Sequence, residues 1–381
     1  MQKKIYIITY KLYDYVTRKY LIGGIQTYIR DLCLVCNEAG HQVQIIQISG
    51  SEDWTIECDG IKIINKATKS KSLRKSYQRS FNEVYTELNT NDSLFIISTD
   101  QMDVKSSGRN VITIQHGIAF DIPGSLIPGV WGKFSILQSM NKFLRCYKNV
   151  QRMYNTKRLV CVDYNYYNWF RTLGTIRNED LVKIVPNYTS SFIDVEKLKT
   201  KMNQKSNTKK IVFARRFVDY RGTLLFANVI NKMIKENFDI DVTFAGSGPL
   251  LEKINSMFEN RSNVHFTSFS PCDSIAFHKQ FDIAVVPTIF SEGTSLSLLE
   301  AMAAGCFPIA THVGGMTNVL LDGYNGRFVA PTEESLYKCL CEVVGMPSSI
   351  FAEYVFHAYE TVTRAFSKES WKKKWLEIIS E

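Results

Sequence analysis

The stretch Glu292–Gly305, which reads EGTSLSLLEAMAAG, decides the fold class of this sequence. An apolar run at 282–286 precedes it and the segment 296–304 consists of good helix formers, so the pattern predicts a strand, a loop and a helix in that order. Backbone N–H groups at the start of such a helix, within Gly293–Ser297, favour an anion such as phosphate. The segment is therefore typical of a nucleotide-binding turn.

Two glutamates of this stretch are candidates for binding hydroxyl groups. Glu292 falls in the predicted loop, and Glu300 falls about two turns further on, on the helix. A carboxylate accepts hydrogen bonds from vicinal hydroxyls, as an acidic residue does for ribose in nucleotide-binding folds. A helix cap with a surface glutamate is the alternative, and it is the weaker one because charge, glycine and spacing agree.

Outward from this turn, short apolar runs alternate with amphipathic segments along the chain. Strands are predicted at 4–9, 42–48, 93–98, 110–115, 158–162, 182–185, 210–214, 241–245, 263–267, 282–286 and 307–311, and helices include 24–39, 223–237 and 295–304. Apolar strands separated by helices indicate parallel sheets covered on both faces. The fold class is therefore α/β, with ligands expected outside the carboxyl ends of the strands.

The length of 381 residues suits two domains. A boundary is predicted at Pro186-Asn187, because a polar stretch follows and a new strand then restarts the alternation. We therefore expect two doubly wound halves, 1–186 and 187–355. The last segment, 356–381, carries Trp371 and Trp375 one helical turn apart, which predicts an amphipathic helix that packs on an apolar surface of the first domain.

Composition narrows the class of protein. A hydrophobic fraction of 45% argues against a disordered chain, and no apolar run approaches the ~20 residues of a membrane-spanning helix. The N-terminal residues show no signal-peptide pattern. The nine cysteines are odd in number and widely scattered, which favours reduced thiols and a cytoplasmic protein.

The net charge of +9 is concentrated in the first half of the chain. The segments 62–79 and 129–160 each contain seven Lys or Arg and no Asp or Glu. In 136–158 the apolar residues recur at helical spacing, namely Ile136, Met140, Phe143, Leu144, Tyr147, Val150, Met153 and Tyr154. Such a basic amphipathic helix either lies on an anionic membrane surface or packs on the first domain. If it binds membrane, a lipid-linked acceptor is favoured.

Two further loops are candidate anion sites. Arg215, Arg216 and Arg221 follow the predicted strand 210–214, and guanidinium groups match the oxygens of a diphosphate. Gly23 and Gly24 open the predicted helix 24–39, where paired glycines allow close approach of an anion to the backbone. A solvated basic loop and a plain helix start are the alternatives.

Taken together, these segments resemble the donor-site signature of the retaining family 4 glycosyltransferases. The resemblance rests on the E-G-x-x-x-x-x-L-E-A-M-A-A-G pattern at 292–305, then Pro308–Thr311 and Gly314-Gly315, and further on Gly23-Gly24, Pro186-Asn187, Arg216–Gly222, Gly246–Pro249 and Asp322–Gly326. It covers the C-terminal half densely and the N-terminal half sparsely. It implies a GT-B fold: two facing Rossmann-like domains with an interdomain cleft, and a C-terminal helix that packs back.

The resemblance also implies roles for particular residues. Arg216 and Arg221 would hold the donor diphosphate, Glu300 the ribose hydroxyls, and Glu292 the hydroxyls of the transferred sugar. Donor binding would further involve Gly23, Gly24 and the backbone amides of Ser295 and Leu296. His116, after the strand 110–115, would face the donor sugar, with Asp121 a weaker candidate. No metal is expected, because no D-x-D precedes a strand end and the arginines would replace it.

Five positions depart from the family pattern. Arg215 stands where the family has glycine, Arg221 where it has lysine, Thr294-Ser295 where it has an aromatic residue and glycine, and Tyr188 where it has glycine. These changes preserve the expected diphosphate site and alter the expected sugar pocket.

The expected function is retaining transfer of a sugar from a nucleotide-diphosphate sugar, UDP in preference to GDP, to a glycan or lipid-linked acceptor in cell-surface polysaccharide or glycoconjugate biosynthesis. The expected location is the cytoplasm or the inner face of the membrane. Two alternatives stay open: a nucleotide-sugar epimerase of similar architecture, and a non-catalytic nucleotide-sugar-binding protein. Nucleic-acid binding is not expected, because no helix-turn-helix, RRM or zinc signature is present.

Overall fold

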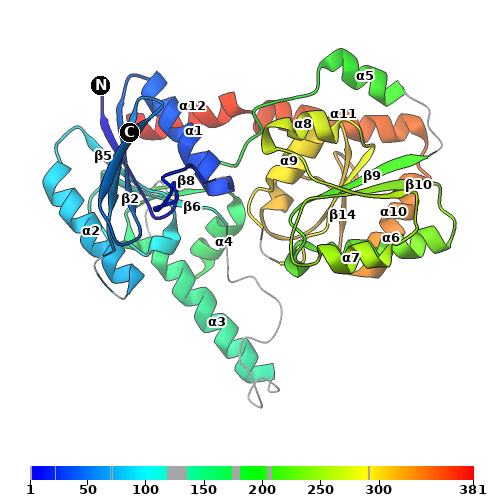
Figure 1. Ribbon diagram of the computed structural model, residues 1–381, viewed down its shortest axis with the longest axis horizontal. Coiled ribbons are helices and arrows are strands. Elements are labelled where there is room, and N and C mark those ends of the chain that lie inside the picture. The colour runs from blue at the N-terminus through cyan, green and yellow to red at the C-terminus, as the bar shows by residue number, and fades with distance from the viewer. Residues whose placement is uncertain are drawn as a thin grey trace. The chain divides into compact units, whose positions relative to one another are not determined.

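A computed structural model describes residues 2–21, 23–68, 70, 72–117, 135–173, 181–203, 208–290 and 292–381 of the chain. It divides into two compact units (Figure 1). Unit 1 comprises Met1–Pro186 and Trp371–Glu381, and unit 2 comprises Asn187–Ser370. Each unit is built on its own sheet, so the chain has the α/β architecture expected from the sequence.

Unit 1 contains an eight-stranded sheet in the order β3-β4-β2-β1-β5-β6-β7-β8, in which only β3 and β4 pair antiparallel. Its strands are β1 (Lys4–Thr9), β2 (Gln42–Ile48), β3 (Trp54–Cys58), β4 (Ile61–Lys66), β5 (Ser93–Ile97), β6 (Val111–Gln115), β7 (Arg158–Cys161) and β8 (Val182–Ile184). Its helices are α1 (Gly24–Glu38), α2 (Leu73–Leu88), α3 (Ser135–Gln151) and α4 (Tyr164–Leu173). In this strand order, the connection from β1 to β2 leads toward the β3 edge of the sheet, and the connection from β4 to β5 leads toward the β8 edge. Right-handed crossovers then place α1 and α2 on opposite faces of the sheet, as Figure 1 shows.

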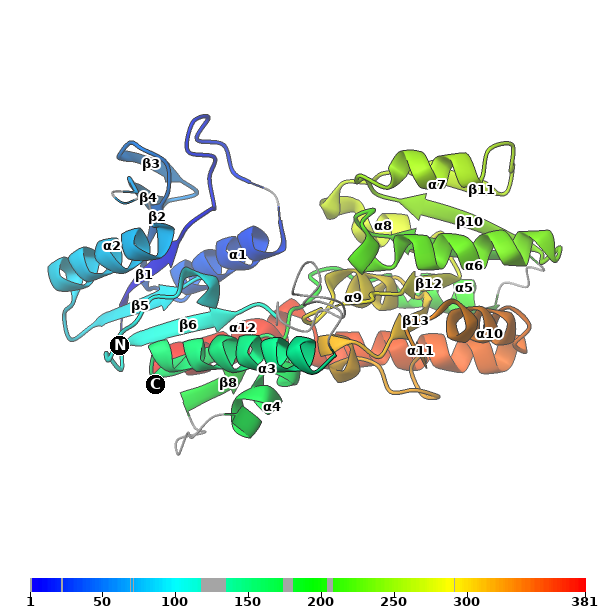
Figure 2. The ribbon, with the colours of Figure 1, turned by 90° about the horizontal axis from the view of Figure 1, so that it is seen from below.

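Unit 2 contains a six-stranded parallel sheet in the order β11-β10-β9-β12-β13-β14. Its strands are β9 (Lys209–Ala214), β10 (Ile240–Ala245), β11 (Val264–Thr267), β12 (Ile283–Val286), β13 (Phe307–Thr311) and β14 (Arg327–Val329). Its helices are α5 (Val195–Asn203), α6 (Thr223–Lys235), α7 (Leu251–Met257), α8 (Ser274–His278), α9 (Leu296–Ala303), α10 (Glu333–Val344) and α11 (Ser348–Ala365). Phenylalanines in ring contact, among them Phe213, Phe226 and Phe244, fill one face of the sheet. On the other face α9 packs with the C-terminal part of α11, and both helices are labelled in Figure 2.

The order of the strands in unit 2 reverses direction between β9 and β12. The chain moves outward from β9 through β10 to β11, returns, and then moves outward again from β12 through β13 to β14. At such a switch point the loops after the two central strands diverge, which opens a crevice for a ligand outside the carboxyl ends of those strands. The loops in question follow Ala214 and Val286.

The C-terminal segment differs from the prediction, which treated 356–381 as one segment. Residues 348–365 form α11 of unit 2, and a separate helix, α12 (Lys368–Ser380), begins after a break. The Ser367 hydroxyl accepts a hydrogen bond from the backbone N–H of Ser370 at 3.2 Å and so starts the new helix. From Trp371 onward, α12 packs in unit 1, where Trp375 donates to the Tyr28 hydroxyl at 2.8 Å.

The basic helix predicted near 136–158 is also shorter than expected. Helix α3 ends at Gln151, a turn of 3₁₀ helix covers Arg152–Asn155, and Arg158 already belongs to β7. The side chains of Met153 and Tyr154 lie outside what the structure describes. No single helix among the described residues is long and apolar enough to cross a membrane. Within the part of the chain that the structure describes, α10 and α11 taken together, with a 114° bend between them, have the length and composition of a broken span.

Candidate functional site

A cluster of one carboxylate and two guanidinium groups lies at the switch point of unit 2. Arg215 follows β9, and Thr288 and Glu292 follow β12. The Oε2 atom of Glu292 accepts from Nη2 of Arg215 at 2.5 Å, from Nη1 of Arg221, and from the Thr288 hydroxyl at 3.0 Å. Only 6% of the Arg215 side chain and 10% of the Glu292 side chain are exposed. Charged groups are rarely so buried unless they are paired, as they are here.

The charges of this cluster favour an anionic ligand. Burial alone would raise the pKa of Glu292, but Arg215 and Arg221 hold it below its ordinary value, so this carboxyl is ionised at neutral pH. Two cations and one anion leave a net charge of +1 at the edge of the sheet. The Oε1 atom of Glu292 accepts no hydrogen bond from the described part of the chain. The cluster therefore combines a cationic surface for phosphate with one carboxylate oxygen for a hydroxyl.

Two glycines allow the surrounding loops to approach the backbone of this cluster. Gly246, at φ +149°, follows β10, and a Cβ atom there would clash with the Arg215 carbonyl. Gly314, at φ +57°, lies against Glu292, and a Cβ atom there would clash with the Glu292 carbonyl. The N–H of Gly315 donates to that same carbonyl at 2.9 Å. The glycines of the G-x-G-P and G-G motifs thus hold Arg215 and Glu292 in position.

The N-terminus of α9 is the second part of the site. Ser295 is the N-cap of this helix and makes no side-chain capping bond. The first N–H groups of a helix have no partner within it and carry partial positive charge, so those from Leu296 onward can meet an anion. Asn187 donates from its side chain to the Thr294 carbonyl at 2.7 Å and so restrains the turn that leads into α9.

Glu300 lies on α9 and is held by one neighbour. Its Oε2 accepts from the Ser274 hydroxyl at 2.7 Å. Burial raises the pKa of Glu300 to about 7, and the hydrogen bond from Ser274 offsets only part of that shift. A buried carboxylate with a single hydrogen bond retains acceptor capacity for the hydroxyls of a ligand.

The other predicted donor-site residues differ in setting. Arg216 is exposed and forms no ion pair with a described residue. Its neighbour Arg215 belongs to the predicted cluster of three arginines but was not assigned to the diphosphate, and it is the buried arginine that pairs with Glu292. Gly23 is the N-cap of α1 and Gly24 its first residue; both belong to unit 1.

His116 lies in unit 1 at the carboxyl end of β6. Its Nε2 donates to the Ser98 carbonyl at 2.9 Å, and its ring packs edge-to-face on Tyr28 at 5.1 Å. Burial lowers the pKa of His116 to about 4, so the imidazole is neutral at physiological pH and its Nδ1 is an acceptor. The preceding residue, Gln115, buries both of its amide atoms without a partner in the described structure, which the sequence did not reveal. Asp121 lies outside the described residues.

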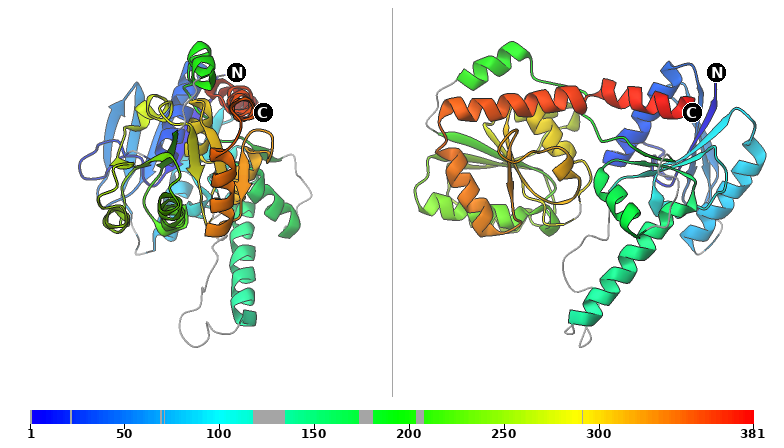
Figure 3. Two further views of the ribbon diagram at one scale, coloured as in Figure 1. Left: turned by 90° about the vertical axis from the view of Figure 1, so that its right-hand side faces the viewer. Right: turned by 180° about the vertical axis from the view of Figure 1, so that it is seen from behind.

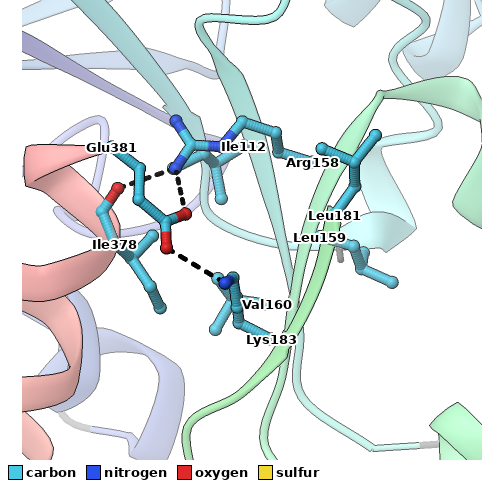
Figure 4. A pocket seen from close by; sticks show the side chains of 8 residues that line it. All are labelled: Ile112, Arg158, Leu159, Val160, Leu181, Lys183, Ile378 and Glu381. Carbon is cyan, nitrogen blue, oxygen red and sulfur yellow. Dashed lines mark hydrogen bonds and ion pairs between the residues drawn. The ribbon is translucent and has the colours of Figure 1, made fainter. Parts of the chain in front are cut away.

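A separate pocket lies at the amino ends of β6, β7 and β8, whereas His116 lies at the carboxyl end of β6. Figure 4 shows Arg158 and Lys183 directed toward Glu381. The ion-pair distances are 3.4 Å for Arg158 and 3.0 Å for Lys183. Arg158 also donates to the Ile378 carbonyl at 2.7 Å. These bonds fasten the end of α12 to unit 1, so we assign this pocket to helix packing.

Metal binding has no structural support in the described ranges, because no three His, Cys, Asp or Glu side chains gather there. The predicted independence from metal stays a prediction. The motifs did not reveal Ser274 and Thr288. Ser274 donates to Glu300, 26 residues away in the chain, and Thr288 accepts from Arg215, 73 residues away.

Comparison with solved structures identifies the fold. Sucrose-phosphate synthase from Thermosynechococcus elongatus matches with a TM-score of 0.73 at 13% identity, over 100% of this chain and 98% of that chain. HepE from Anabaena, in complex with UDP and glucose, matches with a TM-score of 0.69 at 11% identity over 100% of both chains. The fold is therefore GT-B, with two Rossmann-like sheets and C-terminal helices, as the motifs predicted.

Sequence comparison matches the C-terminal region to a protein family. Residues 208–345 match the family described as Glycosyl transferases group 1. An uncharacterized glycosyltransferase of Methanocaldococcus jannaschii, MJ1178, is 30% identical over 118 residues, which are 30% of this chain and 32% of that protein. The chain thus spans about a third of the length of the curated relatives it matches. The region 208–345 is therefore similar to the glycosyl transferases group 1 family.

Proposed function

We propose that this protein is a retaining glycosyltransferase that moves a sugar from a nucleotide-diphosphate sugar to a glycan or lipid-linked acceptor in the synthesis of cell-surface polysaccharide or glycoconjugate. The observation that carries the proposal is the pairing of Arg215 and Arg221 with Glu292 at the switch point of unit 2. UDP is favoured over GDP as the nucleotide, with support from HepE, a protein of similar fold that binds UDP.

The chemistry follows from what each group can stabilise. Negative charge develops on the diphosphate as the glycosidic bond breaks, and preorganised cations and helix N-termini stabilise such charge. Arg221 and the start of α9 supply these groups, while Glu292 Oε1 and Glu300 accept hydrogen bonds from sugar and ribose hydroxyls. Because Glu300 is assigned to ribose, no nucleophile is assigned. His116 remains the candidate for a neutral hydrogen bond to a sugar hydroxyl.

The test of this proposal is turnover of the donor by the full chain. UDP- and GDP-linked hexoses are supplied with a panel of glycan and lipid-linked acceptors, and released nucleotide and glycosylated product are measured, with NMR of the product to read its anomeric configuration. We expect one donor to be consumed with retention in an acceptor-dependent way. Conversion of the donor sugar into its epimer without transfer would identify an epimerase instead, and nucleotide binding with no turnover would identify a binding protein.

The pH dependence of nucleotide binding tests the role of Glu300. Ribose hydroxyls donate to the ionised carboxylate, and with a pKa of about 7 this group is mostly protonated at pH 6 and mostly ionised at pH 8. We therefore expect the Glu300-dependent part of UDP affinity to rise about tenfold from pH 6 to pH 8. Calorimetric titration of UDP into wild type and Glu300→Gln at both pH values measures this part of the affinity. Protonation of the UDP phosphate affects both proteins equally, so the difference between them isolates the effect of Glu300.

The same shift has a consequence for the free protein. When folding raises the pKa of a carboxyl, the folded state becomes less stable as the pH rises from the ordinary pKa of that group to its pKa in the folded protein. Glu300→Gln should therefore raise Tm at pH 8 and leave it nearly unchanged at pH 5. Equal pH profiles of binding in wild type and variant, together with equal Tm values at pH 8, would contradict the assignment of Glu300.

A further inference from the structure

Helix α3 is the least covered helix of unit 1. Only Cys146 and Val150, both near its C-terminal end, are buried. The half that begins at Ser135 extends away from the sheet of unit 1, as the two views of Figure 3 and the view of Figure 1 agree. Its outer turns therefore gain little stability from packing within the described residues.

Large apolar side chains form one exposed face of α3. Five of them are between 42% and 72% exposed, at spacings of i, i+4, i+7, i+8 and i+11: Ile136, Met140, Phe143, Leu144 and Tyr147. Residues with these spacings share one side of an α-helix. A contiguous apolar face of this size on a soluble domain marks a binding surface.

The side of α3 away from this apolar face is basic, and its charges are not neutralised within the described ranges. Lys142, Arg145 and Lys148 lie on the helix, which contains no Asp or Glu, and none of the three forms an ion pair with a carboxylate in the described ranges. The other basic segment of unit 1 behaves differently. On α2, Arg74 pairs with Asp103 at 3.2 Å and Arg79 with Glu83 at 3.1 Å.

This combination of surfaces selects the kind of partner. A second copy of this chain would carry the same excess of cations on α3 and no acid on that helix to offset them, so it offers no charge complement to this helix. An anionic bilayer supplies both complements at once, since headgroups attract the cations and the acyl boundary accepts the apolar side chains. Helices with a strongly charged face and a large apolar face bind in the plane of such an interface.

We propose that α3 docks unit 1 onto an anionic lipid surface, with Ile136, Met140, Phe143, Leu144 and Tyr147 in the acyl boundary and Lys142, Arg145 and Lys148 at the headgroups. This inference goes beyond sugar transfer and does not depend on it, since it concerns unit 1 alone and is read out without a donor. A transferase so placed would meet its acceptor at the membrane surface.

Vesicle co-sedimentation of the full chain tests the proposal. The probes are vesicles of phosphatidylcholine mixed with phosphatidylglycerol, and vesicles of phosphatidylcholine alone. One variant removes apolar surface, Phe143→Ser with Leu144→Ser, and a second removes charge, Lys142→Gln with Arg145→Gln and Lys148→Gln. The matched control is Leu321→Ser, which removes an apolar side chain that is 62% exposed in unit 2.

We expect wild type and the control to bind the mixed vesicles and to bind phosphatidylcholine alone far more weakly. Each cation near an anionic surface contributes about fivefold to affinity, so the charge variant should bind about a hundredfold more weakly. The apolar variant should lose at least about tenfold, and raised salt should weaken wild-type binding.

Circular dichroism of each variant, matched to wild type, excludes unfolding as the cause of lost binding. Two results would overturn the proposal. One is binding that is equal for both kinds of vesicle or for all variants. The other is a wild type that does not bind vesicles but forms an oligomer that the apolar variant does not form, as measured by sedimentation. That result would assign the apolar face of α3 to self-association.

Discussion

Replacing Arg221 with alanine is expected to lower kcat/KM for sugar transfer by about a hundred- to a thousandfold, the cost of removing one preorganised group that stabilises developing charge. Arg221 donates to Glu292 in the free protein, and its side chain is 27% exposed, so it can turn from the carboxylate to a bound diphosphate. Arg215 would continue to hold Glu292 in the variant. The loss should therefore appear mainly in kcat, measured as nucleotide released at saturating donor.

Arg261→Ala is the matched control for this measurement. Arg261 is an exposed arginine of the same unit. It comes just before β11, so it lies at the amino ends of the strands, away from the carboxyl ends where the site lies. Its removal changes the net charge equally and should leave kcat/KM unchanged. If the two variants behaved alike, stabilisation of the leaving group by Arg221 would be wrong.

Replacing Glu292 with glutamine is expected to destabilise the protein at pH 7 by about 3 kcal/mol, because it leaves Arg215 buried without a counter-charge. The direction of the pH dependence of this destabilisation follows from the lowered pKa of Glu292. A carboxyl with a depressed pKa stabilises the folded state above its ordinary range, and that stabilisation is lost as the pH falls through its folded pKa. The difference between wild type and variant, measured by urea unfolding, should thus be largest near neutral pH and shrink in acid.

A double variant separates charge from packing in this result. Arg215→Met with Glu292→Gln removes the buried cation together with the carboxylate, and only the partly exposed Arg221 remains, which can turn toward water. We expect this protein to recover most of the stability lost in Glu292→Gln. A double variant less stable than Glu292→Gln alone would show that Arg215 contributes through packing and not through its charge.

Most strands of both sheets were predictable from the sequence to within one or two residues, because buried parallel strands appear as continuous apolar runs. The prediction omitted β3, β4 and β14, which lie at or next to the sheet edges. For β3 and β4 a signal was present: Asp59 and Gly60 join them, both at positive φ, and this dipeptide is typical of a tight hairpin. Strand β14 has only three residues, which is too short for a recognisable hydrophobic pattern.

The site was predictable in its elements and less so in its contacts. The motif at 292–305 correctly indicated a strand–loop–helix turn, with Glu292 in the loop and Glu300 on the helix. The pairing of Arg215 with Glu292 was not predictable, because it depends on β9 and β12 lying side by side although they are about seventy residues apart in the chain. Likewise, the buried setting that keeps His116 neutral depends on Ser98 and Tyr28, which neighbouring residues do not reveal.

The central claim is that unit 2 binds the nucleotide of a sugar donor at the carboxyl edge of its sheet, with Glu300 on the ribose. Calorimetric titration of UDP into wild type and Glu300→Ala at pH 8 tests it most directly, with GDP, ADP and CMP as competitors for specificity. We predict saturable binding of UDP to wild type and affinity at least about tenfold weaker in the variant, as expected for loss of hydrogen bonds to a charged group. Equal UDP affinity in the two proteins, or no binding of any of these nucleotides to wild type, would contradict the account.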